Sequence, residues 1–266
     1  MGKVVGVLSL KGGVGKTSSV VSIGASLAKM GKKVLLVDGN LSAPNLGLHL
    51  DVITPVKTLH HVLAGEEKID DVIYETHGLD IVPASLFHNL EVNPLKLKNK
   101  IRELKDKYDV ILIDSSPSLD DETLGVMMAS DELLVVTTPD FSTLSMTLKS
   151  VKSAKEKGTP ITGLILNKVH NKNFELSLED IEKTSDVPVM AVIPHDINII
   201  RSQAQFVPST YIKPNSQSNV EYNKLAHLIV GEKYNPPKNI YNILNRFSNP
   251  QRQEINRQIF YNSIFN

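Results

Sequence analysis

The stretch with the clearest chemistry begins at Lys11 and reads Lys-Gly-Gly-Val-Gly-Lys-Thr. The apolar run Val4–Leu8 before it predicts a strand, and apolar residues at helical spacing over 18–30 predict a helix after it. Glycines between a strand and a helix let backbone N–H groups converge on an anion, and the helix N-terminus adds its positive dipole end. We therefore expect a phosphate cradle formed by Gly12, Gly13, Val14, Gly15, Lys16, Thr17 and Ser18.

Two side chains of this loop suit nucleoside triphosphate chemistry. Lys16 would reach the β- and γ-phosphates, and the Thr17 hydroxyl would bind Mg²⁺. The usual P-loop pattern, G-x-x-x-x-G-K-[ST], needs glycine where this chain has Leu10, and a second lysine, Lys11, stands beside it. Lys-Gly-Gly-Val-Gly-Lys-Thr resembles the deviant Walker A motif of the MinD/ParA ATPases, in which two lysines flank the glycines. The resemblance covers residues 1–232 and is greatest to archaeal MinD-like members.

What the resemblance implies is a switch driven by ATP. The cofactors would be ATP and Mg²⁺. ATP would bring two subunits face to face as a homodimer, each Lys11 reaching the phosphates of the other subunit. Hydrolysis of ATP to ADP and phosphate, slow without an unidentified activating protein, would separate them.

Short apolar runs rich in Val, Ile and Leu alternate with helical patterns along the chain. The runs show no polar alternation, as expected of parallel strands covered on both faces. We predict strands at Val4–Leu8, Val34–Val37, Asp80–Val82, Val110–Ile113, Leu133–Thr137, Ile161–Leu166 and Val189–Ile193. We predict helices at Ser18–Met30, part of Thr58–Tyr74, Leu95–Tyr108, Asp121–Ala129, Leu144–Lys157 and Leu178–Thr184. The fold class is therefore α/β: a doubly wound, mostly parallel sheet with helices on both faces, as in P-loop NTPases.

Two carboxylates stand at predicted strand ends. Asp38 follows the second strand and matches the aspartate that ends this strand in the MinD/ParA family. Asn40 stands where the family has a second aspartate, thought to help position the attacking water, so we expect a changed hydrolysis rate. Asp114 ends an apolar strand in a Walker B arrangement, and its carboxylate would hold a water of the Mg²⁺ shell. The resemblance makes Lys11, Lys16, Asp38 and Asn40 the catalytic set.

Two further positions are assigned to the adenine base. Asn167 ends a predicted strand, at the position where the family reads adenine with an asparagine amide that both donates and accepts. Pro194 closes the next strand and resembles the loop that packs on the other side of the base.

Composition narrows the function classes. The 266 residues are 41% hydrophobic, which permits one α/β domain with a tail. Lys+Arg 29 against Asp+Glu 29 gives no global electrostatic case for nucleic acid. The absence of cysteine excludes disulfides, thiol catalysis and cysteine-held Fe–S clusters. No signal-peptide pattern is present, so we expect a cytoplasmic protein.

The end of the chain changes in composition after Pro236-Pro237. We predict a final core helix capped by Ser218, preceded by a short strand within Gln205–Lys213 and ended by Gly231. We divide the chain into an ATPase domain, 1–232, and a C-terminal tail, 233–266, with one or two amphipathic helices.

The tail offers two amphipathic patterns. The first, Asn239–Phe247, resembles the membrane-targeting tail of the MinD branch, which implies a peripheral position at the inner face of the cell membrane. The second follows Pro250 and carries Ile255, Ile259, Phe260 and Phe265, with Arg252 and Arg257 alongside. The alternative is that such a helix packs on the body of the chain.

Two other functions stay open. A ParA-type partitioning ATPase would bind nonspecific DNA through a basic surface, for which Lys149, Lys152, Lys155 and Lys157 on one predicted helix are candidates. An ATP-bound scaffold with very slow hydrolysis is the third reading, suggested by Asn40.

Overall fold

The computed structural model describes residues 2–87, 90–236 and 251–265. For residues 264 and 265 it describes the backbone alone. Within these residues an eight-stranded sheet runs through the centre in the order β3-β4-β2-β5-β1-β6-β7-β8. Neighbouring strands are parallel except for the β3–β4 hairpin at one edge. The strands are β1 (Lys3–Leu8), β2 (Val34–Asp38), β3 (Tyr74–Thr76), β4 (Leu79–Val82), β5 (Val110–Asp114), β6 (Glu132–Thr137), β7 (Ile161–Val169) and β8 (Val189–Pro194).

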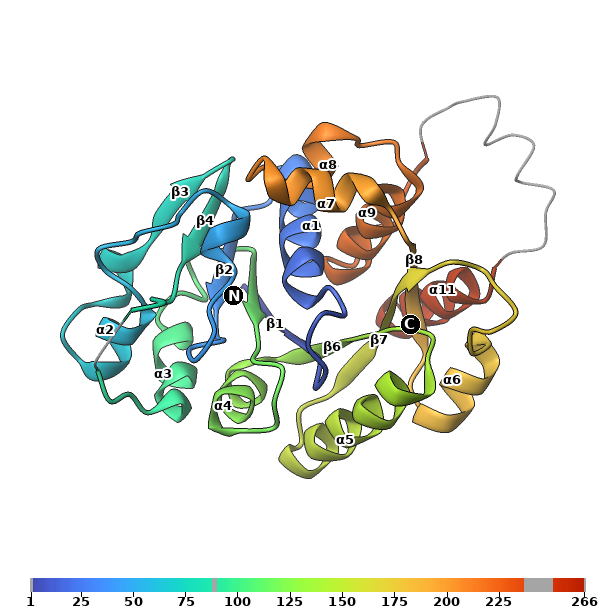
Figure 1. The fold of residues 1–266 in the computed structure, drawn as a ribbon, viewed down its shortest axis with the longest axis horizontal. Helices are drawn as coiled ribbons and strands as arrows, with labels where there is room; N and C mark the ends of the chain where they lie inside the picture. The colour runs from blue at the N-terminus through green and yellow to red at the C-terminus, as the bar shows by residue number, and fades with distance from the viewer. Residues whose placement is uncertain (1, 88–89, 237–250, 266) are drawn as a thin grey trace.

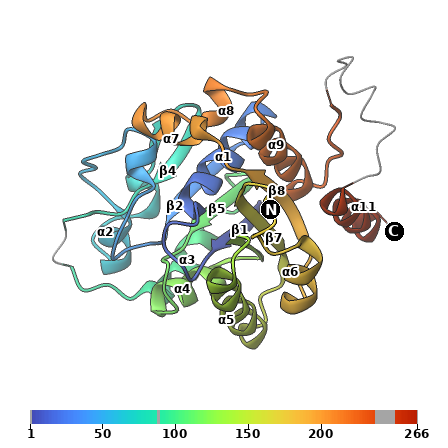
Figure 2. The same ribbon diagram turned by 45° about the vertical axis from the view of Figure 1, so that its right-hand side comes forward.

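Helices cover both faces of the sheet. Figures 1 and 2 show α1 (Lys16–Lys29), α7 (Ile197–Ala204), α8 (Ser209–Ile212) and α9 (Gln217–Ile229) on one side. On the other side lie α3 (Leu97–Arg102), α4 (Asp121–Ala129), α5 (Phe141–Lys157) and α6 (Leu178–Ser185). The shorter elements are α2 (Leu59–Ala64) and the 3₁₀ turns η1 (Gly47–His49), η2 (Ile69–Val72) and η3 (Pro94–Lys96), and α11 (Arg252–Phe265) ends the chain. The predicted α/β fold with a doubly wound, mostly parallel sheet is confirmed.

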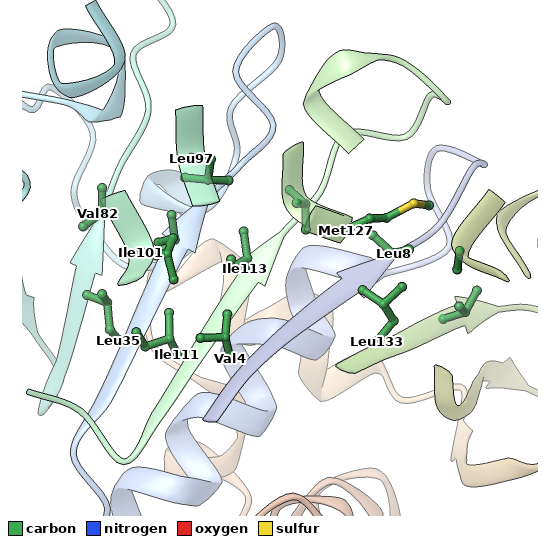
Figure 3. Close-up of a cluster of buried hydrophobic side chains, with 14 of the residues drawn as sticks. Val4, Leu8, Leu35, Val82, Leu97, Ile101, Ile111, Ile113, Met127 and Leu133 are labelled. Carbon is green, nitrogen blue, oxygen red and sulfur yellow. The ribbon is translucent and has the colours of Figure 1, made fainter. Parts of the chain in front are cut away.

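Two hydrophobic clusters, one on each face, hold the layers together. Val4 and Leu8 of β1 belong to one cluster, whereas Val5 and Val7 belong to the other. Figure 3 shows the first cluster, in which Val4 and Leu8 lie among side chains from the neighbouring strands and from α3 and α4. Alternate residues of a strand point to opposite faces, so a strand covered on both sides must be apolar throughout. This is why β1 has no polar alternation.

Two local predictions are wrong. The segment Gln205–Lys213 contains the helix α8 and no strand. The N-cap of α9 is Ser216, whose hydroxyl accepts from the Asn219 amide at 3.4 Å, and Ser218 lies inside the helix. Ser218 donates instead to Asp196, at the start of α7. Both serines stand before an apolar face, so the sequence pattern alone did not distinguish them.

Strand β3 was not predicted, and one predicted helix is shorter in the structure. Strand β3 is a three-residue edge strand paired with β4 through a tight turn in which His77 and Gly78 have φ of 52° and 71°. Its side chains are half-buried or exposed, so it lacks the apolar run that marks a buried strand. Within the predicted helix Leu95–Tyr108, only Leu97–Arg102 is α-helical.

The last described helix, α11, packs on the body. It contacts β8, and Tyr261 is 7% exposed. Arg257, 5% exposed, donates to the Met190 carbonyl at 2.7 Å and to Glu221 of α9 at 3.0 Å. The second amphipathic pattern of the tail is therefore held by the core, while the first, Asn239–Phe247, lies outside the described residues.

Candidate functional site

A cavity lies at the carboxyl edge of the sheet, where the loops after β1, β2 and β5 meet the ends of β7 and β8. It measures about 370 Å³. Its walls include Lys11, Gly12, Gly13, Val14, Gly15, Lys16, Thr17, Ser18, Asn40, Asn45, His49, Pro117, Asn167, Lys168, Pro194, His195, Asp196, Ile199, Ile200 and Gln203. Parallel strands end at the same edge, so residues far apart in sequence meet there. The structure thus brings the expected phosphate cradle together with Asn40, Asn167 and Pro194.

The phosphate loop is shaped by two glycines in the left-handed region. Gly13 has φ 78° and Gly15 has φ 93°, which a residue with a Cβ adopts only under strain. A Cβ on Gly15 would also stand 2.3 Å from the Asn167 amide nitrogen. That nitrogen donates to the Val14 carbonyl at 2.7 Å, and Lys168 Nζ donates to the Gly13 carbonyl at 2.6 Å. The end of β7 therefore braces the loop from outside.

A tight cluster at the carboxyl end of β5 is formed by Lys16, Thr17 and Asp114. Lys16 Nζ lies 2.5 Å from Asp114 Oδ1 and also contacts the Ser115 carbonyl oxygen. The Thr17 hydroxyl donates to the other Asp114 oxygen at 2.6 Å. Asp114 is fully buried and Lys16 is 8% exposed, so the ion pair is shielded from solvent.

These donors fit a Mg²⁺–nucleotide complex. A hydroxyl and a carboxylate oxygen within hydrogen-bond distance are the hard ligands that Mg²⁺ accepts, directly or through its retained waters. Thr17 would bind the ion and Asp114 would hold one of its waters. Bound Mg²⁺ would neutralise charge that develops on the phosphates during transfer.

Asp38 lies beside Asp114 in the parallel register of β2 and β5. Its carboxylate is fully buried and accepts from the backbone amides of Asn40 at 3.2 Å, Asn45 at 3.1 Å and Leu46 at 3.0 Å. Burial, reinforced by the charge of Asp114, raises the pKa of Asp38 to about 7. The side chain therefore organises the loop that follows β2, since it binds three of its amides.

Asn40 stands on that loop, 4% exposed. Its side-chain amide donates to the Ala43 carbonyl, while its Oδ1 is buried and has no hydrogen-bond partner among the described residues. The same loop is tied to α4, because the Ser42 amide donates to Glu122 at 3.0 Å. Asn40 thus lines the cavity while its Oδ1 remains a buried acceptor without a partner among the described residues.

Lys11 takes a different direction from Lys16. Its Nζ donates to Thr143 Oγ1 at 2.9 Å and lies 3.3 Å from Asp140 Oδ1, at the N-terminus of α5. Burial raises the pKa of Asp140, but hydrogen bonds from Thr138, Thr143 and Lys11 outweigh it and lower that pKa to about 2. The two lysines that flank the glycines therefore contact different elements: Lys16 contacts the end of β5, and Lys11 contacts the start of α5.

Sequence reasoning missed several cavity residues, among them His49, Lys168, His195 and Gln203. Lys168 directly follows Asn167 and His195 directly follows Pro194, so extending each motif by one residue would have found them. Gln203 of α7 donates to the Ser18 hydroxyl at 2.7 Å. No motif marks His49 or Gln203, because their position depends on how η1 and α7 pack against α1.

Neither a metal-binding cluster nor a membrane-spanning helix is found among the described residues. They contain no group of three or more His, Asp or Glu side chains that could hold a metal ion by themselves. Nor is any helix among them both long and apolar enough to span a membrane.

Comparisons with known proteins agree with this geometry. A family model described as an AAA domain matches residues 2–160. An uncharacterized ATP-binding protein of Methanocaldococcus jannaschii is 34% identical over 237 residues, which is 88% of this chain and 90% of that protein. The chromosome-partitioning ATPase Soj of Treponema pallidum is 31% identical over 254 residues, 86% of this chain and 98% of Soj.

Among solved structures, the septum site-determining protein MinD of Pyrococcus horikoshii OT3, complexed with Mg-ADP, superposes with a TM-score of 0.81. It is 36% identical, and the match covers 85% of this chain and 95% of that one. The chain belongs to the MinD/ParA family of P-loop ATPases. The cofactors of this MinD/ParA ATPase are accordingly ATP and Mg²⁺, which its Lys16, Thr17 and Asp114 cluster fits.

Proposed function

We infer that this MinD/ParA ATPase is a dimerising switch that ATP turns on and hydrolysis turns off. The observation that carries the inference is the position of Lys11. Its side chain lines the cavity and is 37% exposed, and its ammonium group contacts Asp140 and Thr143 rather than the Lys16–Asp114 cluster of its own site. A half-exposed ammonium group beside the phosphate cradle is accessible to a second subunit and can form charge-assisted hydrogen bonds to phosphate oxygens bound there. Each Lys11 would then reach the phosphates held by the other subunit.

The residues of one subunit suffice to bind the nucleotide. Backbone amides of the glycine loop would hold the phosphates, and Lys16 would bind the β- and γ-phosphates. Asn167 and Pro194 would contact adenine on either side. Asp38 and Asn40 would set the loop that orients the attacking water. Because phosphoryl transfer depends chiefly on positioning and charge stabilisation, the cross-subunit Lys11 would raise turnover together with dimerisation.

The experiment is sedimentation velocity of the full chain with ATP, ADP or no nucleotide. We expect a dimer with ATP and a monomer in the other two conditions. A hydrolysis assay on the same samples should show turnover that rises with protein concentration, because only the dimer is complete. A monomer with saturating, non-hydrolysed ATP would contradict the switch.

A membrane surface is the partner we assign to the ATP dimer, through Asn239–Phe247 of the tail. Ile240, Ile243, Leu244 and Phe247 are its apolar residues. Each offers at most about 1.5–3 kcal/mol of apolar burial. A helix as short as this sequence pattern predicts is marginal in water, so one tail should bind weakly and two tails on one dimer much more tightly. The relative MinD of Synechocystis sp., a septum site-determining protein 29% identical over 241 residues, supports a role in spatial positioning.

Co-sedimentation with liposomes tests this partner. Binding should require ATP, and Leu244→Glu should abolish it while the ATP dimer persists. If Leu244→Glu instead lowers the stability of the monomer, this segment packs on the body, and the membrane assignment is wrong.

DNA is the second candidate surface, and one observation favours it. Lys149, Lys152 and Lys157 of α5 are exposed and have no ion-pair partner among the described residues, whereas Lys155 lies 3.0 Å from Asp186. Three unpaired cations on one helix could contact successive phosphates. A DNA shift assay with ATP at several salt concentrations separates the candidates, and Lys152→Glu should weaken binding only if DNA is the partner.

A nucleotide-locked scaffold is the third candidate. Its motive is Asn40, which replaces a carboxylate near the attacking water. Single-turnover hydrolysis in the presence of either surface would distinguish a slow enzyme from a scaffold that keeps its ATP.

A further inference from the structure

His49 is a cavity residue that no motif of the family accounts for. It ends η1, the turn that begins where the Leu46 amide is held by the buried Asp38 carboxylate at 3.0 Å. The His49 and Leu50 amides donate to the Leu46 and Gly47 carbonyls, both at 3.1 Å. Leu46 and Leu50 are fully buried, whereas His49 is partly exposed at the cavity wall. The turn is thus fixed at both ends, and the imidazole between them borders the cavity.

The imidazole of His49 is free to bind a ligand. Among the described residues it makes no hydrogen bond. The three lysines of the cavity differ, since each already has a protein partner: Asp140 for Lys11, Asp114 for Lys16 and the Gly13 carbonyl for Lys168. A partly buried polar group without a partner costs free energy unless a ligand or water satisfies it.

The surroundings of His49 locate the ligand atom. His49 also borders a smaller cavity with Ser18 and Ser22 of α1 and Gln203 of α7. It therefore lies beside the first turns of α1, next to Ser18 and Ser22 at the end of the phosphate loop. Lys16 serves the β- and γ-phosphates, while the loop and helix start cradle the α- and β-phosphates. The α-phosphate is accordingly the part of a nucleotide that we expect beside His49.

We propose that the His49 imidazole donates a hydrogen bond to the α-phosphate of the bound nucleotide and so contributes affinity for ATP and ADP alike. This inference rests on nucleotide binding in the cavity and adds a residue to it. Burial and the charge of Lys16 lower the pKa of His49 against the opposing effect of Asp114, so the neutral ring predominates and offers one N–H donor. A hydrogen bond from a neutral donor to a phosphate oxygen is charge-assisted, which makes it stronger than a neutral pair.

Calorimetric titration of the full chain with ADP and Mg²⁺ tests the contact. His49→Ala should weaken ADP about tenfold, the loss expected for a hydrogen bond to a charged group, and should weaken a non-hydrolysable ATP analogue by the same factor. His49→Gln keeps an N–H donor and should recover part of the affinity. His227→Ala is the matched control, because His227 lies on α9 and bonds the Asn223 carbonyl at 2.8 Å outside the cavity. Thermal unfolding without nucleotide shows whether each variant is folded.

An α-thio analogue of ADP locates the contact. Sulfur is a weaker acceptor than oxygen, so wild type should lose affinity when oxygen is replaced, and His49→Ala should lose less. Unchanged ADP affinity in folded His49→Ala overturns the proposal, and so does an equal sulfur effect in both proteins. A wild-type chain that binds no adenine nucleotide would overturn the proposed function as well, which distinguishes the two failures.

Discussion

Lys11 Nζ lies 3.3 Å from Asp140 Oδ1, so the first lysine of the phosphate loop is tied to the N-cap of α5 within its own chain. Asp140 also accepts from the Thr143 amide at 2.9 Å, which fixes the carboxylate at the helix start. For Lys11 to reach a second subunit it must exchange this half-exposed ion pair for phosphate oxygens. Exposed ion pairs contribute only about 0–1 kcal/mol to stability, so breaking the Lys11–Asp140 pair costs little free energy.

Lys11→Ala should therefore leave nucleotide binding to the monomer nearly unchanged and remove ATP-dependent dimerisation and turnover. The reason is that the side chain contacts α5 and not the Lys16–Asp114 cluster. Sedimentation velocity with ATP, alongside calorimetric ADP binding, measures both effects. A Lys11→Ala protein that dimerises at the wild-type concentration would refute the cross-subunit role.

Lys16→Ala should abolish ATP binding. Lys16 is the buried cation of the cluster, and its loss leaves Asp114 uncompensated next to the phosphates. We expect at least a hundredfold loss of affinity, about 3 kcal/mol or more, in calorimetric titration. Lys168→Ala is the comparison, since Lys168 only braces the Gly13 carbonyl and its loss should be milder.

Gly15→Ala should weaken both the fold and nucleotide binding. Its φ of 93° is strained for alanine, and the new Cβ would meet the Asn167 amide nitrogen at 2.3 Å. The strain costs about 1–3 kcal/mol of unfolding free energy, measurable by urea titration. Gly12→Ala should cost less, because a Cβ there meets nothing within 4 Å. Equal effects of the two substitutions would argue against the Gly15–Asn167 contact.

Asn40→Asp should raise steady-state phosphate release at saturating ATP, because a carboxylate orients and polarises water better than an amide. The same change removes the donor to the Ala43 carbonyl, so the melting temperature should fall slightly. Nucleotide affinity should change little. An unchanged or slower rate would mean that other groups position the water.

Arg257→Leu should destabilise the protein by about 2 kcal/mol, because it leaves the buried Glu221 with Lys224 as its remaining partner at 2.8 Å. Chemical denaturation measures the loss. Arg252→Leu is the control and should cost less, because Arg252 is 48% exposed and its partner Glu182 keeps hydrogen bonds from the Val189 amide and Asn256. If Arg257→Leu is neutral, α11 contributes little to the stability of the body.

The sequence by itself determined the order of elements and the phosphate loop. Parallel strands buried on both faces must be apolar throughout, so their sequences are easily recognised. Gly13, Gly15 and Lys16 between a strand and a helix are typical of a phosphate-binding loop. Such signals are local, since they depend on residues that are neighbours in the chain. The edge strand β3 was less visible because its half-buried and exposed side chains form no apolar run, and the Ser216 cap because Ser218 is an equally suitable neighbour.

Only the tertiary structure decided which strand ends meet and what each side chain contacts there. The Asn167–Val14 brace joins residues 153 positions apart, and the Lys11–Asp140 pair joins residues 129 apart. His49 enters the cavity because Asp38 fixes the turn before it and two buried leucines flank it. Likewise, the sequence of α11 is compatible with a free amphipathic helix, and only the contacts of the buried Arg257 with Glu221 and β8 show that it packs on the body. Such contacts depend on packing between distant segments, which no local pattern of residues encodes.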